Sequence, residues 1–147
     1  MDSKFENCDF SNSRFLNIYL KNCKIKSCKA DGSSFIDAKL KDTVIDTSFF
    51  RYTNFTSSSW EDCELIDSDF QEAFLSEVKF KKVNFFRVNL SGVDFFNTPL
   101  KNIDLSDSSI EGLAMSDTCA ELKGARISIL QTVDVAKLLG IRIVERG

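Results

Sequence analysis

A five-residue period decides the fold of this chain, and it is plainest in the stretch Ser68-Asp69-Phe70-Gln71-Glu72-Ala73-Phe74-Leu75-Ser76-Glu77-Val78-Lys79-Phe80. Every fifth residue here is large and apolar, and the residue two positions before it is small or β-branched. The same spacing extends outward to Phe5 and Met115, and 22 of the 23 such positions hold a large apolar residue, with Ala30 as the exception. Repetition at a fixed period predicts a repeat architecture.

The period indicates a short extended segment followed by a turn, repeated without insertion. Residues two apart lie on one side of an extended backbone, whereas a period of five fits neither a helix nor a long strand. Turn-forming residues recur two places after the large residue, as at Asn12, Asn22 and Asp67, with Gly32 and Gly92 at equivalent places. Such a chain climbs on itself as a solenoid in which each coil pairs with the next.

The individual repeats resemble those of the pentapeptide-repeat family, in which a small residue, Asp or Asn, and Leu or Phe are followed by two polar residues. Cys8-Asp9-Phe10-Ser11-Asn12 and Ser68-Asp69-Phe70-Gln71-Glu72 are close copies of that pattern. The resemblance covers residues 1–118 and implies an all-β solenoid, a right-handed quadrilateral β-helix with four repeats per coil. Twenty residues per coil give about six coils, and a rod ~27 Å long at ~4.8 Å between paired strands.

Length and composition indicate a single soluble domain. The 147 residues suit one core, no apolar stretch is long enough to span a bilayer, and the start of the sequence lacks the apolar region of a signal peptide. We therefore expect a cytoplasmic protein with no membrane partner.

Four of the five cysteines, Cys8, Cys23, Cys28 and Cys63, fall at the small inward position of the repeat, where they are predicted to be buried fillers. Cys8 and Cys28 are expected to stack on adjacent coils. A disulfide between them is conceivable under oxidation but is not expected in a reducing compartment.

The chain offers little for catalysis. It contains no histidine, which excludes Ser-His and Cys-His nucleophile pairs and the commonest metal ligand. No Cys-x-x-Cys pair, glycine-rich phosphate loop or acidic metal-binding loop is present, and the many Asp residues fall at turn positions. We predict a protein that is not an enzyme, with no catalytic, cofactor-binding or metal-binding residue.

Charge is unevenly distributed if the coil has four sides. The side that carries Leu20, Leu40 and Trp60 holds seven lysines against three carboxylates, whereas the other three sides carry a small excess of acid. This pattern fits an ordinary solvated surface, or an anionic partner on the lysine side, or a basic partner on the other sides. Trp60 itself follows the inward register and is predicted to lie in the core.

Several aromatic residues lie outside the inward register and are predicted to face solvent. Scattered exposed apolar residues are normal, but a cluster of them more often marks a contact surface. The candidates for a partner-binding surface, including three lysines of the basic side, are Phe49, Tyr52, Phe74, Phe86, Phe96, Lys79, Lys81 and Lys82.

The period ends after Met115, and residues 119–147 follow a different pattern. Ser128 and Gln131 have the spacing of a capping box and Gly140 is a natural helix stop, so one short helix is expected between them. The alternation over 141–144 predicts a strand. This segment is expected to cap the open end of the solenoid.

The ending also resembles the tail of the Qnr-type quinolone-resistance branch of the same family, through Leu122-x-Gly124, Ser128-x-x-Gln131 and Leu138-Leu139-Gly140-Ile141-x-Ile143. In that branch the resemblance implies a head-to-head homodimer through the C-terminus and a rod that imitates duplex DNA. The implied partner is a type II topoisomerase (DNA gyrase or topoisomerase IV), with reduced fluoroquinolone susceptibility and no direct binding of nucleic acid. The residues assigned to the dimer interface are Ile129, Leu130, Val133, Leu138, Leu139, Ile141 and Ile143.

Two functional classes therefore remain open from the sequence. One is a non-enzymatic dimeric rod that binds a type II topoisomerase. The other is a generic structural or protein-interaction solenoid with an unrelated partner, favoured by the lack of room for projecting loops and by a net charge of only −3.

Overall fold

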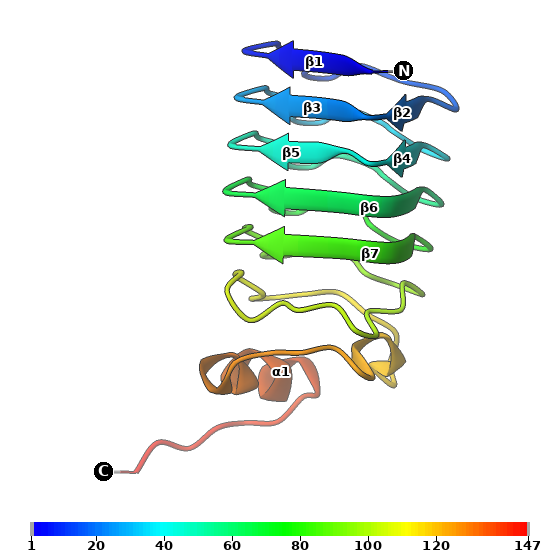
Figure 1. Cartoon of the computed structure of the whole chain (residues 1–147). Coiled ribbons are helices and arrows are strands. Elements are labelled where there is room, and N and C mark those ends of the chain that lie inside the picture. The colour runs from blue at the N-terminus through cyan, green and yellow to red at the C-terminus, as the bar shows by residue number, and fades with distance from the viewer. Residues whose placement is uncertain (1, 147) are drawn as a thin grey trace.

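The computed structural model describes residues 2–146 as a single parallel β-solenoid (Figure 1). Its strands are β1 (Ser3–Glu6), β2 (Tyr19–Lys21), β3 (Cys23–Lys26), β4 (Lys39–Lys41), β5 (Val44–Asp46), β6 (Ser59–Ile66) and β7 (Lys79–Phe86). Every pairing between these strands is parallel and joins residues 20 apart in the sequence, for example Phe5 with Ile25 and Leu65 with Phe85. The predicted fold class, an all-β solenoid with four repeats per coil, is confirmed.

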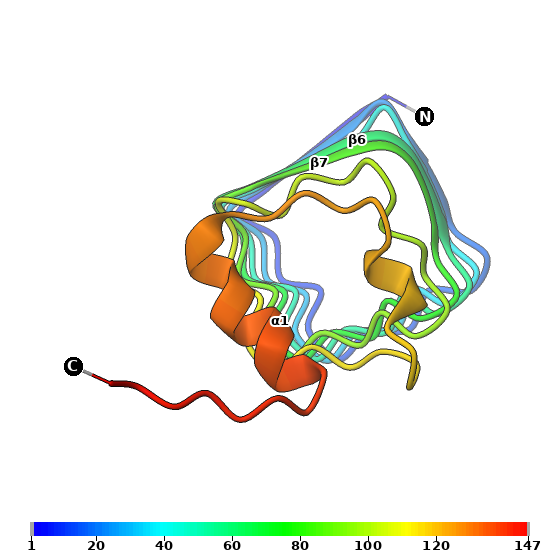
Figure 2. The same ribbon diagram turned by 90° about the horizontal axis from the view of Figure 1, so that it is seen from below.

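The four sides arise because the backbone turns at every fifth residue. From Asn7 to Asn102 each residue two places after the large inward one has a positive φ, with Gly32 and Gly92 among them at +70°. A left-handed residue at the second central position is what a type II turn requires. Seen along the axis, the coils therefore superimpose as a four-cornered outline (Figure 2).

The inward residues form a core of stacked aromatic rings. Phe15, Phe35 and Phe55 lie on successive coils with ring centroids 4.9 Å apart at both steps. Phe50 stacks on Phe70 at 5.1 Å. Trp60 is buried, as the sequence predicts, and its indole Nε1 donates to Ser58 Oγ at 3.0 Å. Because Phe recurs at the same position of successive coils, burial of the rings also brings them into stacking contact.

The coils continue beyond the last strand. The regular strand ladder covers about four turns, fewer than the six coils expected, because residues 87–126 hold their neighbours through isolated bridges such as Asp94 with Ala114 and Asp104 with Arg126. The inward residues of these later coils, including Leu90, Phe95 and Leu105, are fully buried. The solenoid therefore extends further than its strands.

Two 3-10 turns and one helix form the C-terminal cap: η1 (Ala120–Leu122), η2 (Ile129–Gln131) and α1 (Thr132–Leu138). The short helix expected between Ser128 and Gly140 is present, and it lies along one side of the coil end (Figure 2). Gly140, at φ +80°, ends it, with its N–H donating to Lys137 and that of Ile141 to Ala136. This is the Schellman arrangement of helix ends.

The strand predicted over 141–144 is not formed. These residues run away from the body as an extended chain (Figure 1), and no strand ladder within residues 2–146 includes them. An alternating sequence becomes a strand only where a second strand supplies hydrogen-bond partners, and none lies beside this tail. No helix among the described residues is long and apolar enough to cross a membrane.

Replacing Phe50 by Ala is expected to lower the free energy of unfolding by about 3–5 kcal/mol, because a buried ring that stacks on Phe70 would leave a cavity. Phe49→Ala is the matched control, since the preceding ring is 41% exposed and contacts the guanidinium of Arg51 on the surface. Its cost should stay below about 1 kcal/mol. Chemical denaturation measures both, and equal costs would contradict the assignment of inward and outward positions.

Candidate functional surfaces

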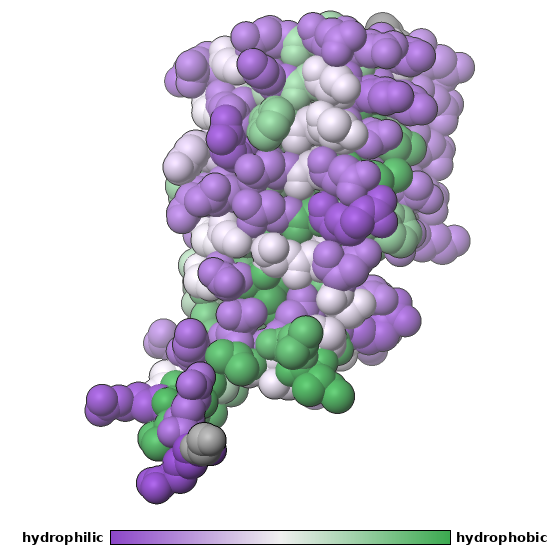
Figure 3. Space-filling view, turned by 90° about the vertical axis from the view of Figure 1, so that its left-hand side faces the viewer, coloured by the Kyte–Doolittle hydropathy of each residue, from purple (hydrophilic) through white to green (hydrophobic). Residues whose placement is uncertain are grey.

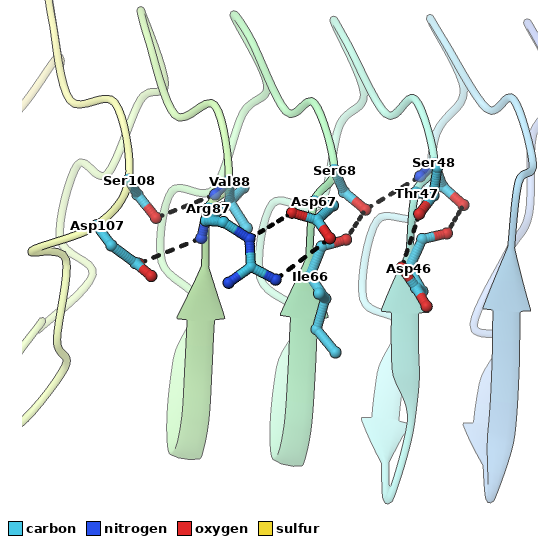
Figure 4. Close-up of polar contacts among 10 residues, drawn as sticks. All are labelled: Asp46, Thr47, Ser48, Ile66, Asp67, Ser68, Arg87, Val88, Asp107 and Ser108. Atoms are coloured by element: carbon cyan, nitrogen blue, oxygen red, sulfur yellow. Dashed lines mark hydrogen bonds and ion pairs between the residues drawn. The ribbon is translucent and has the colours of Figure 1, made fainter.

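One corner of the solenoid carries a ladder of charged side chains (Figure 4). Asp67 directly follows β6, Arg87 directly follows β7, and Asp107 occupies the same position one coil later. The Arg87 guanidinium donates to both carboxylate oxygens of Asp67, from Nε at 2.6 Å and from Nη2 at 3.2 Å. The backbone N–H of Arg87 donates to Asp107 Oδ1 at 3.2 Å.

This ladder lines a shallow open groove of about 420 Å³ along the same corner. Thr47, Phe49, Asp69 and Asn89 are among the other residues that line it. The hydrogen bond from Arg87 lowers the pKa of Asp67, and the same contact raises the pKa of Arg87, so both groups are charged at neutral pH. With Asp67, Asp69 and Asp107 against Arg87, the groove has an acidic excess.

The carboxylates of the groove already have hydrogen-bond partners within the protein. They are fixed by Arg87 or by backbone N–H groups, as where the N–H of Gln71 donates to Asp69 Oδ1 at 2.9 Å. Within residues 2–146, no group of three or more His, Cys, Asp or Glu side chains is placed to hold a metal ion. What the groove offers is an open, acidic surface with Phe49 at its edge.

The opposite charge gathers on the strands. Tyr19, Lys39, Ser59 and Lys79 form one outward column across β2, β4, β6 and β7, and Lys21, Lys41, Glu61 and Lys81 form the next. Among these, Lys81 pairs with Glu61 at 3.5 Å. Lys21 and Lys41 face the same way on adjacent strands, which is unfavourable without an anion between them. The named strands hold nine lysines against five carboxylates, so the remainder of the chain is acidic.

Sequence comparison decides the family of this chain. A family model described as a pentapeptide repeat region matches residues 1–75, just over half of the chain. The chain belongs to the pentapeptide-repeat family. Members of this family are generally structural or binding proteins rather than enzymes. Among curated proteins, none matches this sequence.

Several solved structures of pentapeptide-repeat proteins are similar to this one. A trypsin-treated form of QnrB1, a plasmid-mediated fluoroquinolone resistance protein, is 16% identical, with 96% of this chain and 97% of that chain covered and a TM-score of 0.47. Rfr23 from the cyanobacterium Cyanothece 51142 is 13% identical, with 86% and 89% covered and a TM-score of 0.32. A protein of the Arabidopsis thaliana thylakoid lumen is 19% identical, with 89% and 76% covered and a TM-score of 0.35.

The off-register aromatics of this pentapeptide-repeat chain are exposed, as the register predicts, but they do not form one cluster. Their exposed fractions run from 39% to 58%. They occupy different columns, and no ring-to-ring contact joins any two of them within residues 2–146. Phe86 lies beside Ile66, and Phe49 lies under Arg51, whose Cζ is 5.1 Å from the ring centroid. The five candidates therefore mark several small surfaces; they are Phe49, Tyr52, Phe74, Phe86 and Phe96.

The three candidate lysines, Lys79, Lys81 and Lys82, are also exposed and lie together on β7.

A buried carboxylate in the cap was missed by the sequence reasoning. Glu121 accepts hydrogen bonds from the N–H of Asn97 at 2.9 Å and from the N–H and Oγ of Ser116 at 3.0 and 2.8 Å. Burial acts to raise its pKa, but the hydrogen bonds from Ser116 and Asn97 outweigh burial and lower it. Glu121 thus ties the end of the repeats to the cap.

Gln131 is the second polar anchor, and it has a role beyond the predicted capping box. The capping box with Ser128 is present, with Gln131 Oε1 accepting from the Ser128 N–H at 2.8 Å. Gln131 is also buried, and its Nε2 donates to the carbonyl oxygens of Leu105 at 2.6 Å and Ser108 at 2.7 Å. Those carbonyls belong to the last coils, so this side chain holds the helix against the solenoid.

Large apolar side chains gather on the outer surface of the cap, toward the lower end of the face in Figure 3. We call this the C-terminal apolar surface; its residues are Ile129, Leu130, Val133, Leu139, Ile141, Ile143 and Val144. Six of these were predicted from the tail. Leu138, also predicted, instead lies on the inner side of α1 and packs against the core. Val144 was not predicted and is 71% exposed.

Glu121 should make the cap sensitive to acid. A carboxylate whose pKa is lowered on folding contributes stability above its ordinary value near 4.5, and this contribution is lost as the pH falls through the lowered value. Glu121→Gln is expected to cost about 2 kcal/mol at neutral pH and to reduce the loss of stability between neutral and acid pH.

Thermal unfolding of the wild type, Glu121→Gln and the control Asp117→Asn across this pH range measures the effect. Asp117 is an exposed neighbouring carboxylate, so its substitution should leave both stability and pH dependence nearly unchanged. A Glu121→Gln variant with the same pH dependence as the wild type would contradict the role of the charge.

Proposed function

We propose that this protein is a non-enzymatic, protein-binding rod that forms a homodimer through its C-terminal apolar surface. The observation that carries the proposal is the concentration of exposed apolar side chains there. Of the 15 large apolar residues that are exposed within residues 2–146, seven lie between Ile129 and Val144, and the side chains of Ile129 and Leu130 are 86% and 87% exposed. An apolar surface of this kind on a small protein typically marks an interaction site.

The energetics favour covering this surface. Burying one Ile or Leu side chain completely contributes about 1.5–3 kcal/mol, so a few such residues suffice for a stable interface if the shapes match. A two-fold dimer presents the same surface from both subunits, which pairs apolar with apolar throughout. The extended tail from Ile141 would also gain hydrogen-bond partners for its backbone in such a dimer.

The dimer can be tested by light scattering on the intact chain. The wild type is expected at twice the chain mass of 16.6 kDa at micromolar concentration, and an Ile129→Asp, Leu130→Asp double variant as a monomer, because two charges would be buried unpaired. Leu16→Asp is the matched control, since that side chain is 76% exposed in the first coil. A monomeric wild type would contradict the assignment.

We further propose that the partner is a type II topoisomerase and that binding reduces its susceptibility to fluoroquinolones. Support comes from membership of the pentapeptide-repeat family and from the resemblance of the tail motifs, such as Leu138-Leu139-Gly140-Ile141, to the Qnr-type branch. The acidic excess of the groove at Asp67, Asp69 and Asp107 suits a basic, DNA-binding surface. Acidic charge is modest overall, so the groove rather than the whole rod would provide the contact.

A gyrase supercoiling assay with purified protein, with and without a fluoroquinolone, tests this partner. The wild type should alter supercoiling or its inhibition at micromolar concentration, and an Asp67→Asn, Asp69→Asn, Asp107→Asn variant should need about tenfold more protein. Asp42→Asn, Asp62→Asn, on the lysine-bearing side, is the control and should act as wild type. If the wild type has no effect, the topoisomerase is excluded and the dimeric rod serves an unrelated partner.

A further inference from the structure

The 20-residue register brings two cysteines together across the first two coils. Asp9 and Lys29 are directly paired, so the residues before them, Cys8 and Cys28, occupy the same inward position on adjacent coils. The N–H of Lys29 donates to the carbonyl oxygen of Cys8 at 2.9 Å, which holds the two backbones side by side.

The two thiols also share an orientation. Cys8 Sγ lies 3.5 Å from the carbonyl oxygen of Glu6, and Cys28 Sγ lies 3.4 Å from that of Lys26, the equivalent residue one coil on. Cys28 Sγ is in addition 3.4 Å from the carbonyl oxygen of Phe5, so it already points toward the coil that contains Cys8.

The spacing is suitable for a covalent bond. Paired strands lie about 4.8 Å apart, inside the range of about 4.4–6.8 Å between the Cα atoms of disulfide-bonded cysteines. At that spacing the two Cβ atoms have to approach by about 1 Å to reach the mean separation of ~3.8 Å found in disulfides. Among the described residues, the first coil is paired on one side only, through contacts such as β1 with β3, which leaves it room for this adjustment.

No other two cysteines in residues 2–146 have this relation. Cys23 and Cys63 share a position in the coil but are two coils apart, with Thr43 between them, and Cys119 precedes η1 in the cap. Among the described residues, only Cys8 and Cys28 occupy the same position on adjacent coils, so the 20-residue register identifies them as the pair.

The two thiols differ in access. Cys28 is fully buried, and burial raises the pKa of its thiol, so it stays protonated at neutral pH. Cys8 is only half-buried and is therefore the group that a reagent from solution meets first. A half-buried reacting cysteine beside a fully buried resolving one allows oxidation to begin at the more accessible thiol.

We propose that Cys8 and Cys28 form a redox-modification site that closes into a disulfide on oxidation by a hydroperoxide. The Cys8 thiolate attacks the hydroperoxide and becomes a sulfenic acid as the O–O bond breaks, and the alkoxide or hydroxide that leaves takes up the proton lost by the Cys8 thiol to depart as an alcohol or water. The Cys28 sulfur then attacks the Cys8 sulfur to form the S–S bond. The hydroxide that leaves the sulfenic acid takes the proton of the Cys28 thiol and departs as water. Overall, two thiols lose two electrons and two protons, and the peroxide bond is reduced.

The bond would join the first coil covalently to the second. It closes the segment between Cys8 and Cys28, which contains Phe10 and Phe15, two of the residues that line an apolar cavity in the first coils. Closing this loop restricts the unfolded and partly unfolded states, so opening of the first coil becomes rarer. This effect concerns the opposite end of the rod from the C-terminal apolar surface and does not depend on the proposed dimer or partner.

The test treats the full-length wild type with hydrogen peroxide and counts thiols after denaturation. Two of the five thiols should be lost, a peptide map should give Cys8 linked to Cys28 with the mass of two hydrogens missing, and dithiothreitol should restore all five. Cys8→Ser and Cys28→Ser should each abolish the linked peptide, whereas a Cys23→Ser, Cys63→Ser variant should still form it.

Hydrogen exchange provides a second readout on the folded protein. Oxidation of the wild type should slow amide exchange in residues 9–27 by at least about tenfold and leave α1 unchanged. Oxidation of Cys8 to sulfinic acid without a crosslink, a different disulfide, or an intermolecular disulfide would each overturn the proposal.

Discussion

The structure depends on one repeated interaction, the backbone hydrogen bonds between coils 20 residues apart. A typical coil bonds to both of its neighbours, as where the N–H of Lys29 donates to Cys8 in the coil before and the N–H of Ala30 donates to Phe49 in the coil after. Because the offset stays at 20 from the first coil to Ala114, each position of the repeat becomes a straight column. The stacked Phe rings, the lysine columns on the strands and the aspartates of the groove all follow from this single register.

The backbone hydrogen bonds between coils are strong enough to hold residues at a positive φ that their side chains disfavour. Asn and Asp tolerate positive φ, and they supply many of the turns. Yet Tyr52, Lys82 and Arg87 adopt the same conformation at equivalent places, at φ values of 59°, 55° and 51°. Such residues pay about 1 kcal/mol or more each for it, a cost that the hydrogen bonds on both sides offset. Turn composition therefore helps to recognise the repeat but does not by itself determine each corner.

The last coil has no following coil to satisfy its backbone hydrogen-bonding groups. In the cap, polar side chains bind some of these groups instead. Glu121 binds backbone N–H groups at the end of the repeats, and Gln131 binds carbonyl oxygens of the last coils. With these groups satisfied, Leu122, Val135 and Leu138 pack inward. The remaining apolar residues of α1 and the tail have no place against a coil end and stay exposed, which is why the surface proposed for dimerisation lies there.

The sequence by itself determined the repeat, its phase, the buried and exposed faces and the position of the short helix, because a fixed period of five leaves one register for the whole chain. It also identified most of the exposed residues near the C-terminus. It did not reveal that Glu121 and Gln131 are buried anchors or that Asp67, Arg87 and Asp107 form one ladder. The dispersal of the off-register aromatics was likewise not evident from the sequence. Glu121 and Gln131 lie outside the repeat, so the five-residue period does not say which coil they contact. Whether a polar side chain finds a partner, on the backbone or on another side chain, is decided only by the folded chain.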